Sequence, residues 1–258
     1  MRHVYAFEKP LEAPLHDIEW LKQQLEPFQQ WLRSDFAVCD MPKGFIWTTW
    51  ELATNFFRDE KPLAAYTSED FIYLSPELDE WKGFYAKAFA DSPEPIRTYF
   101  KTITLNEILT IAGHELVHHS DFFVDDFSGD YEHSIWFEEG MCDYIARKHL
   151  LGRAQFDERL AIDQAIVEHY TPQFGTQAID DFGQATYARQ NLTEIFYEYC
   201  RSFITVQQLV DVRYKGDITE VFRIYKDWHT NGRQTSLASC FTTEVKFQHE
   251  RYISSLSA

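Results

Sequence analysis

The sequence predicts an α+β protein with a small β-sheet in an N-terminal lobe and a mostly helical C-terminal lobe. Two segments, 45–50 and 70–74, are rich in aromatic and β-branched residues and are bounded by Pro, Gly and Asp, which is typical of short strands. After Pro95, apolar residues recur mostly at helical spacing. The 258 residues contain no internal repeat and no long Gly/Ser/Pro linker, so we expect one compact unit, with a β-containing lobe over about 1–100 and a helical lobe over about 101–258.

The helices are predicted from periodicity and from end signals. Apolar residues at helical spacing indicate a first helix over 17–32. Ser75, followed by Pro76, is typical of an N-cap with proline at the first helical position, opening a helix to Phe89. Thr104 and Glu107 fit a capping box that opens a helix to His119. Further helices are predicted over 136–150 and 184–203, with one or two more within 206–228 and 241–256.

Composition limits the partners and the compartment. The formal net charge is -17, and such an acidic surface disfavours nucleic acid and anionic membranes. The first twenty residues lack the apolar run of a signal peptide, and the four cysteines are scattered without a CxxC pair. These features favour a reduced, cytoplasmic protein.

One predicted helix carries a candidate metal site. His114 and His118 lie four residues apart in the segment His-Glu-Leu-Val-His, so both imidazoles project from one helix face towards one point. Glu115 lies beside that face, where it can reach a water on the metal without being a ligand. The surrounding residues are apolar, and buried charged groups need partners. The spacing therefore predicts a zinc site, although a chance motif remains the alternative.

A catalytic zinc needs a third protein ligand. The metzincin pattern requires Gly and His where this sequence has Asp121 and Val124, so that pattern fails. The segment 136–144 offers Glu138 or Glu139 instead. Asp143 lies four residues after Glu139 and can orient a ligand histidine, so we favour Glu139 as the ligand and Asp143 as the partner of His114.

The remaining candidates have simpler interpretations. Glu138 is expected to face solvent or the cleft, and the acidic loop 121–134 is expected to be a solvated loop or lid. His133 is a rival third ligand in that loop. His119 is expected to point away from the metal, and Cys142 to be a small buried residue.

The segment 105–150 resembles the gluzincin metallopeptidases, the group that includes thermolysin and the zinc aminopeptidases. His-Glu-Leu-Val-His-His is followed by Trp-Phe-Glu-Glu-Gly-Met-Cys-Asp-Tyr, which is similar to the family pattern W-[LF]-x-E-G-x-x-[DE]-Y. The resemblance implies a zincin-like fold and a zinc held by His114, His118 and Glu139. It also implies hydrolysis of peptide or protein substrates with Glu115 as the general base.

Two further features follow from this resemblance. Tyr187 corresponds to a tyrosine that stabilises the oxyanion in zinc aminopeptidases, although Arg189-Gln190 stands where that family has Lys-Gly. The strand 65–74 resembles the edge strand along which gluzincins bind extended peptides. The sequence leaves the oligomeric state and cleavage preference open. An inactive binding or regulatory protein with a structural zinc is the alternative function.

Overall fold

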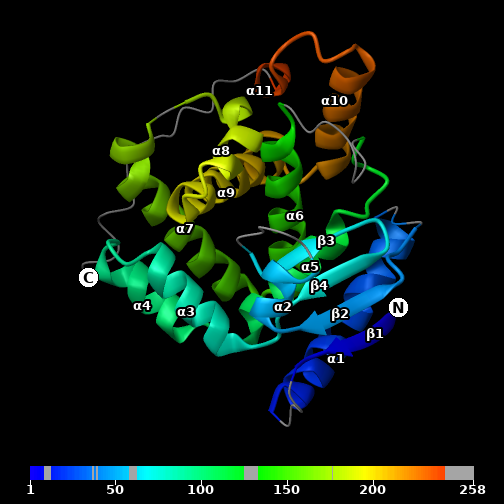
Figure 1. Ribbon diagram of the computed structural model, residues 1–258. Helices are drawn as coiled ribbons and strands as arrows, with labels where there is room; N and C mark the ends of the chain where they lie inside the picture. The colour runs from blue at the N-terminus through cyan, green and yellow to red at the C-terminus, as the bar shows by residue number, and fades with distance from the viewer. Residues whose placement is uncertain are drawn as a thin grey trace.

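A computed structural model describes residues 1–8, 13–36, 38, 40–57, 63–124, 133–175 and 177–241 (Figure 1). The fold is α+β, as predicted, with one small sheet and a larger helical part. The four strands are β1 (Arg2–Ala6), β2 (Gly44–Thr48), β3 (Ala65–Thr67) and β4 (Phe71–Leu74). Their order is β1-β2-β4-β3. β1, β2 and β4 are parallel, and β3 runs antiparallel to β4.

The predicted strand regions 45–50 and 70–74 are confirmed for residues 45–48 and 71–74, which lie in β2 and β4, whereas Thr49 caps a short helix that begins at Trp50. The predicted edge strand 65–74 is instead two antiparallel strands, with β3 at the edge of the sheet and β4 inside it. β2 and β4 bury Phe45, Trp47, Ile72 and Leu74 almost completely, which explains their apolar composition. The strand β1 was not predicted. It is a sheet edge with Val4 and Tyr5 more than two-fifths exposed, so its sequence lacks a buried apolar run.

The helices pack on one hydrophobic core that continues into the sheet. They are α1 (Ala13–Asp35), α2 (Trp50–Asn55), α3 (Leu78–Ala88), α4 (Glu94–Thr102), α5 (Leu105–Val117), α6 (Ile135–Leu150), α7 (Arg153–Phe174), α8 (Gln184–Ala188), α9 (Leu192–Gln207), α10 (Ile218–Thr230) and α11 (Leu237–Cys240), with short 3-10 and π turns at Ile179–Asp181 and Gln208–Arg213. No helix in the described ranges is long and apolar enough to cross a membrane.

Helix α5 lies at the centre of this arrangement. It packs against α1, α6 and the strands β3 and β4, so it joins the sheet to the helical part (Figure 1). Most of its residues are buried, including His114 and Glu115. α6 packs against both α5 and α9. Helix α5, which carries His114 and Glu115, is therefore enclosed by other elements on most sides.

Several predicted helix ends are wrong. Helix α3 begins at Leu78 with Glu77 at the N-cap position, because the Ser75 hydroxyl binds the Glu80 carboxylate. Thr104 does cap α5, accepting from the amide of Asn106, but the Glu107 carboxylate does not complete a capping box. It turns inward to Arg159 and Tyr85 instead, because those buried groups offer stronger, charge-assisted hydrogen bonds.

The predicted helix 184–203 is two helices. Gln190 has a positive φ of 51°, which breaks the helical path between α8 and α9. Asn191 then caps α9 through a side-chain hydrogen bond from the Glu194 amide. Helix α7 was not predicted at all. The predicted helix 241–256 lies beyond the described residues except for Phe241, and most of the acidic loop 121–134 also lies outside them.

Candidate metal centre

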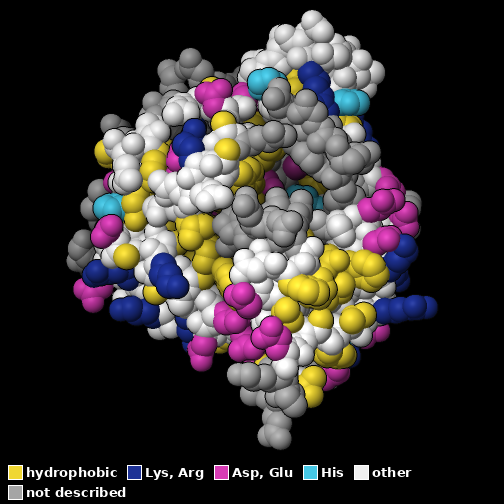
Figure 2. All heavy atoms as spheres, in the orientation of Figure 1, with side chains coloured by type: hydrophobic (Ala, Val, Ile, Leu, Met, Phe, Trp, Pro, Cys, Tyr) yellow, Lys and Arg dark blue, Asp and Glu magenta, His cyan; other side chains and the backbone are white. Residues whose placement is uncertain are grey.

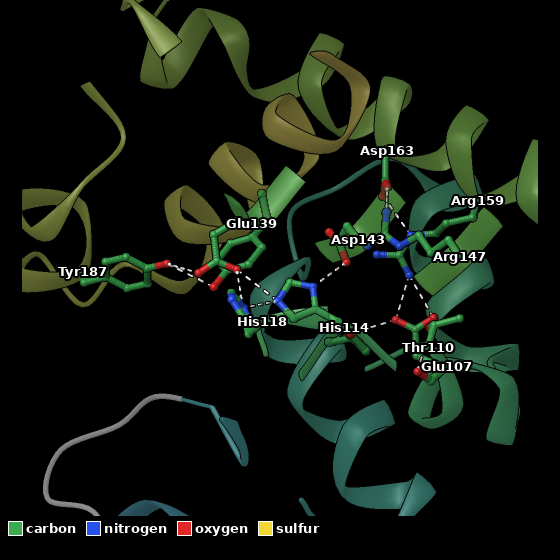
Figure 3. A network of polar contacts seen from close by, with 12 residues as sticks. Glu107, Thr110, His114, His118, Glu139, Asp143, Arg147, Arg159, Asp163 and Tyr187 are labelled. Carbon is green, nitrogen blue, oxygen red and sulfur yellow. Dashed lines mark hydrogen bonds and ion pairs between the residues drawn. The ribbon is translucent and has the colours of Figure 1, made fainter. Parts of the chain in front are cut away.

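Three predicted ligands meet at one point between α5 and α6. The Nε2 atoms of His114 and His118 are 3.1 Å apart, as expected for residues one helical turn apart. The Oε2 atom of Glu139, on α6, lies 3.0 Å from His114 Nε2 and 3.6 Å from His118 Nε2. Figure 3 shows the three side chains converging from the two helices.

These distances match the donor set of a tetrahedral zinc. With zinc bonds of about 2.0–2.1 Å, neighbouring ligand atoms of a tetrahedron are about 3.3–3.4 Å apart. The three separations of 3.0, 3.1 and 3.6 Å lie around that value. Two nitrogens and one carboxylate oxygen also form the ligand chemistry that zinc accepts.

The carboxylate of Glu139 has an unsatisfied atom at this point. Its Oε2 atom is fully buried and accepts no hydrogen bond of acceptable geometry from the described residues. Burial opposes ionisation of Glu139, yet the neighbouring His114 and His118 hold its pKa well below the ordinary value. A buried anion with an unsatisfied oxygen is stabilised by a cation, so the residues present fit a metal ion.

His114 is oriented from its other ring nitrogen. Its Nδ1 atom lies 3.1 Å from Asp143 Oδ1, which leaves Nε2 pointing to the common point. Burial lowers the pKa of His114, but the close carboxylates of Asp143 and Glu139 outweigh burial and raise it to about 10. The site therefore favours positive charge at His114, in the form of a proton or of a metal ion that replaces it.

Glu115 is buried beside the two histidines, with 7% of its surface exposed. Burial raises the pKa of its carboxyl, and the nearby His114 and His118 partly oppose that rise. Within the described part of the chain no hydrogen bond to this carboxylate is formed. Its position and its raised pKa suit a group that takes up a proton.

Tyr187, on α8, also reaches the site. Its hydroxyl lies 3.5 Å from Glu139 Oε1 and 3.0 Å from the hydroxyl of Tyr199, on α9. A phenol has one proton, so Tyr187 donates to only one of these oxygens at a time. Burial raises the pKa of both tyrosines well above the ordinary value, so both stay protonated donors.

Tyr199 was not predicted as a site residue. Its ring lies 6.2 Å from the ring of His114, centroid to centroid. Tyr199 stands within an ordinary helical stretch, Phe-Tyr-Glu-Tyr-Cys, and no local motif marks it. Only the packing of α9 against α6 brings it to the histidines.

The expectation for Glu138 needs correction. Glu138 does not face solvent or the cleft: it is only 3% exposed and accepts a 2.7 Å hydrogen bond from the Tyr225 hydroxyl. His119 lies off the metal face, as predicted, and it is buried. Its Nε2 atom lies 2.7 Å from Thr67 Oγ1 on the edge strand β3, and burial lowers its pKa to about 4.

Cys142 and His133 were the other residues considered near the site. Cys142 is fully buried, as predicted, and its thiol lies close enough to His114 and His118 for the three ligand atoms to fall within 4.8 Å of one another. It is therefore a second possible ligand. His133 is exposed and has a positive φ of 70°.

The surface near β3 and α6 is hollowed. Figure 2 shows a depression at the centre of this face, with histidine, acidic and hydrophobic side chains visible inside it. The edge strand β3 packs against α5, so it lies along one side of the metal centre.

No family model, curated protein or solved structure matches this chain. The assignment of the site therefore rests on its residues and their geometry.

Proposed function

We propose that this protein is a zinc-dependent metallopeptidase that hydrolyses peptide bonds. The observation that carries the proposal is the convergence of His114 Nε2, His118 Nε2 and Glu139 Oε2 at separations of 3.0–3.6 Å. Zinc prefers this donor set, and three protein ligands leave the fourth position open for water or substrate, as in catalytic zinc sites.

Glu139 is the preferred third ligand over Cys142. The neighbouring histidines keep the Glu139 carboxylate ionised, and its Oε2 atom has no hydrogen bond to lose. Burial raises the pKa of the Cys142 thiol well above its ordinary value, so ligation by sulfur would first require a costly deprotonation.

The protein's own residues supply the proton transfers. Bound zinc would provide a Lewis acid and a water of lowered pKa. Glu115 accepts the proton of the attacking water, for which its raised carboxyl pKa is suited, and passes it to the leaving nitrogen. Asp143 holds His114 in the tautomer that presents Nε2 to the common point.

Tyr187 is the candidate donor to the developing oxyanion. Its hydroxyl is already directed to the site, 3.5 Å from Glu139, and its pKa keeps it protonated. The Tyr187 hydroxyl donates to the Tyr199 hydroxyl at 3.0 Å, a contact that holds it near the site until an oxyanion accepts its hydrogen bond. One well-placed donor of this kind contributes about 2.7–4 kcal/mol to transition-state stabilisation.

A peptide is the proposed substrate because of the edge strand. Among the described residues β3 pairs with β4 on one side only, so its other edge can pair with an extended peptide. The gluzincin-like motifs of 105–150 support the same substrate class. The cleavage preference follows from residues that line the depression, and a peptide library would define it.

The test starts with the metal. We expect about one zinc per chain by mass spectrometry of the purified protein, loss of that zinc in Glu139→Gln, and retention in Cys142→Ser. Peptide-library cleavage should require zinc and stop with a chelator. Absence of zinc from the wild type would contradict the metal centre.

Glu115→Gln separates catalysis from a purely structural metal. This variant should keep zinc and the fold while losing turnover. If the wild type holds zinc but cleaves no peptide in the library, the protein is a binding or regulatory module with a structural zinc.

A further inference from the structure

A chain of buried ion pairs continues from Asp143 away from the metal centre. Asp143 Oδ2 accepts a 2.9 Å hydrogen bond from Arg147 Nη2, and Arg147 Nη1 donates to Asp163 Oδ2 at 2.7 Å. Asp163 Oδ1 accepts from Arg159 Nε at 2.9 Å, and Arg159 Nη1 donates to both carboxylate oxygens of Glu107, at 2.7 and 2.9 Å. Figure 3 shows this continuous line of contacts.

The members come from three helices and alternate in sign. Asp143 and Arg147 belong to α6, Asp163 and Arg159 to α7, and Glu107 to α5. Each of them is at most 8% exposed, and Asp163 is completely buried. In such surroundings each charge depends on its neighbours, because water does not replace a lost partner.

Arg147 connects Asp143 to helix α7. Arg147 uses separate nitrogens for Asp143 and Asp163, so its guanidinium fixes the Asp143 carboxylate relative to α7. The other Asp143 oxygen then faces His114 Nδ1. Glu107 closes the line at its far end, where Tyr85 also donates to it at 2.8 Å.

We infer that Arg147, Asp163, Arg159 and Glu107 form a positioning relay that sets the orientation of His114 through Asp143. None of the four touches the metal ligands or a substrate, so they are positioning residues. The relay supports the ligand geometry of the proposed zinc site, and in that respect it rests on the proposed function.

The far end of the relay is the best place to test it. Glu107, Arg147 and Arg159 line a cavity of about 250 Å³, so a change of Glu107 does not have to be absorbed by a fully packed core. Glu107→Gln keeps the shape and removes the charge. Asp163→Asn likewise keeps the shape and removes the charge, at the completely buried middle residue of the line. Arg147→Lys keeps the positive charge but lacks the planar guanidinium that binds two carboxylates at once.

The matched control is Glu198→Gln. Glu198 is a glutamate with the same 8% exposure as Glu107, and it pairs with Arg201 at 2.8 and 3.0 Å. That pair makes no contact with the relay in the described residues. It reports the cost of losing a buried glutamate charge that has no connection to His114.

The first readout is zinc affinity, measured by competition with a chromophoric chelator. We expect Glu107→Gln and Asp163→Asn to lose about tenfold, the low end of the range for outer-sphere partners of metal ligands. The control should stay within about twofold. The melting temperatures of metal-free Glu107→Gln and Glu198→Gln should fall similarly, so that affinity and stability are separated.

The second readout uses metal-free protein and is independent of zinc binding. In nitrogen-15-labelled histidine spectra, the Nδ1–H signal of His114 should move in the relay variants and remain in place in Glu198→Gln. If the wild type binds no zinc, the proposed function fails and this signal alone decides the relay. If Asp163→Asn does not fold, Glu107→Gln and Arg147→Lys decide it. Affinity and His114 signals that match the control in every folded relay variant would overturn the relay.

Discussion

Replacing Gly140 with alanine would test the packing that places Glu139. Gly140 follows Glu139 on α6 and faces the backbone of α9. A Cβ there would lie 2.5 Å from the Ser202 carbonyl oxygen and 2.8 Å from Val206 Cγ2. Ordinary contact begins near 3.4 Å, so α6 and α9 must separate by several tenths of an ångström.

The magnitude follows from two opposing contributions. Overpacking against a fixed backbone costs about 3 kcal/mol at the upper end of the usual range. Alanine in place of glycine inside a helix returns about 1 kcal/mol. We therefore expect Gly140→Ala to lower the free energy of unfolding by about 2 kcal/mol, and the melting temperature by about 4–8 °C. The displaced Glu139 should also weaken zinc binding.

The control is Gly83→Ala on α3, where a Cβ would meet nothing within 4 Å. It gains the same helix propensity without a clash, so it should be about 0.8–1.0 kcal/mol more stable than the wild type. Urea unfolding of the metal-free proteins, followed by circular dichroism, measures both changes. A Gly140→Ala protein as stable as Gly83→Ala would refute the close approach of α6 and α9.

Three further outcomes are expected. Glu115→Gln should retain zinc and the wild-type stability, but its rate of peptide cleavage should fall at least about 100-fold, the low end of the contribution of a general base. Measurements of peptide turnover and of zinc content check this. Tyr187→Phe should lower kcat about 100–1,000-fold, because its hydroxyl is the proposed donor to the oxyanion. Tyr199→Phe removes only the contact that supports this hydroxyl, so it should lower kcat less. Equal losses of kcat in the two variants would instead indicate a shared structural role. Burial, followed by the charge of Lys22, lowers the pKa of His3 to about 4, so the unfolded chain binds more protons between pH 6.5 and 4. The resulting stability is present above pH 6.5 and is lost towards pH 4, and the urea midpoint of His3→Gln should vary less over this range.

The sequence was sufficient for those parts of the molecule that local signals define. β2 and β4 have the aromatic and β-branched composition of buried strands, and the helical spacing of His114 and His118 placed their imidazoles together. Asp143 was predicted because it lies one turn after Glu139, and its contact with His114 Nδ1 is present. Each of these predictions needed only one element and its period.

Helix α7 could not be predicted in the same way. Its buried side includes Arg159 and Asp163, which pattern analysis assigns to a solvent-exposed face. Its N-cap is Gly152, which offers no side-chain signal. The charges are buried because Glu107 and Arg147 on other helices neutralise them, and that pairing exists only in the folded chain.

The break between α8 and α9 is a different case, because a local signal was present. Asn191 is followed three residues later by Glu194, which is typical of a helix N-terminus, and Asn191 does cap α9. The continuous apolar spacing across 184–203 outweighed this signal. Cap residues inside a long periodic segment therefore merit more weight than periodicity alone.

The buried charges explain why the short motif depends on so much of the chain. Helix α5 could supply two imidazoles and Glu115 by itself, but it offers no third ligand and nothing to orient His114. α6 provides both through Glu139 and Asp143. The added carboxylate then needs Arg147, whose charge in turn needs Asp163 on α7. Each step satisfies a group that the previous step buried, so the proposed metal centre depends on the packing of all three helices. A sequence that contained only the histidine motif on an isolated amphipathic helix would lack this support and would bind zinc more weakly.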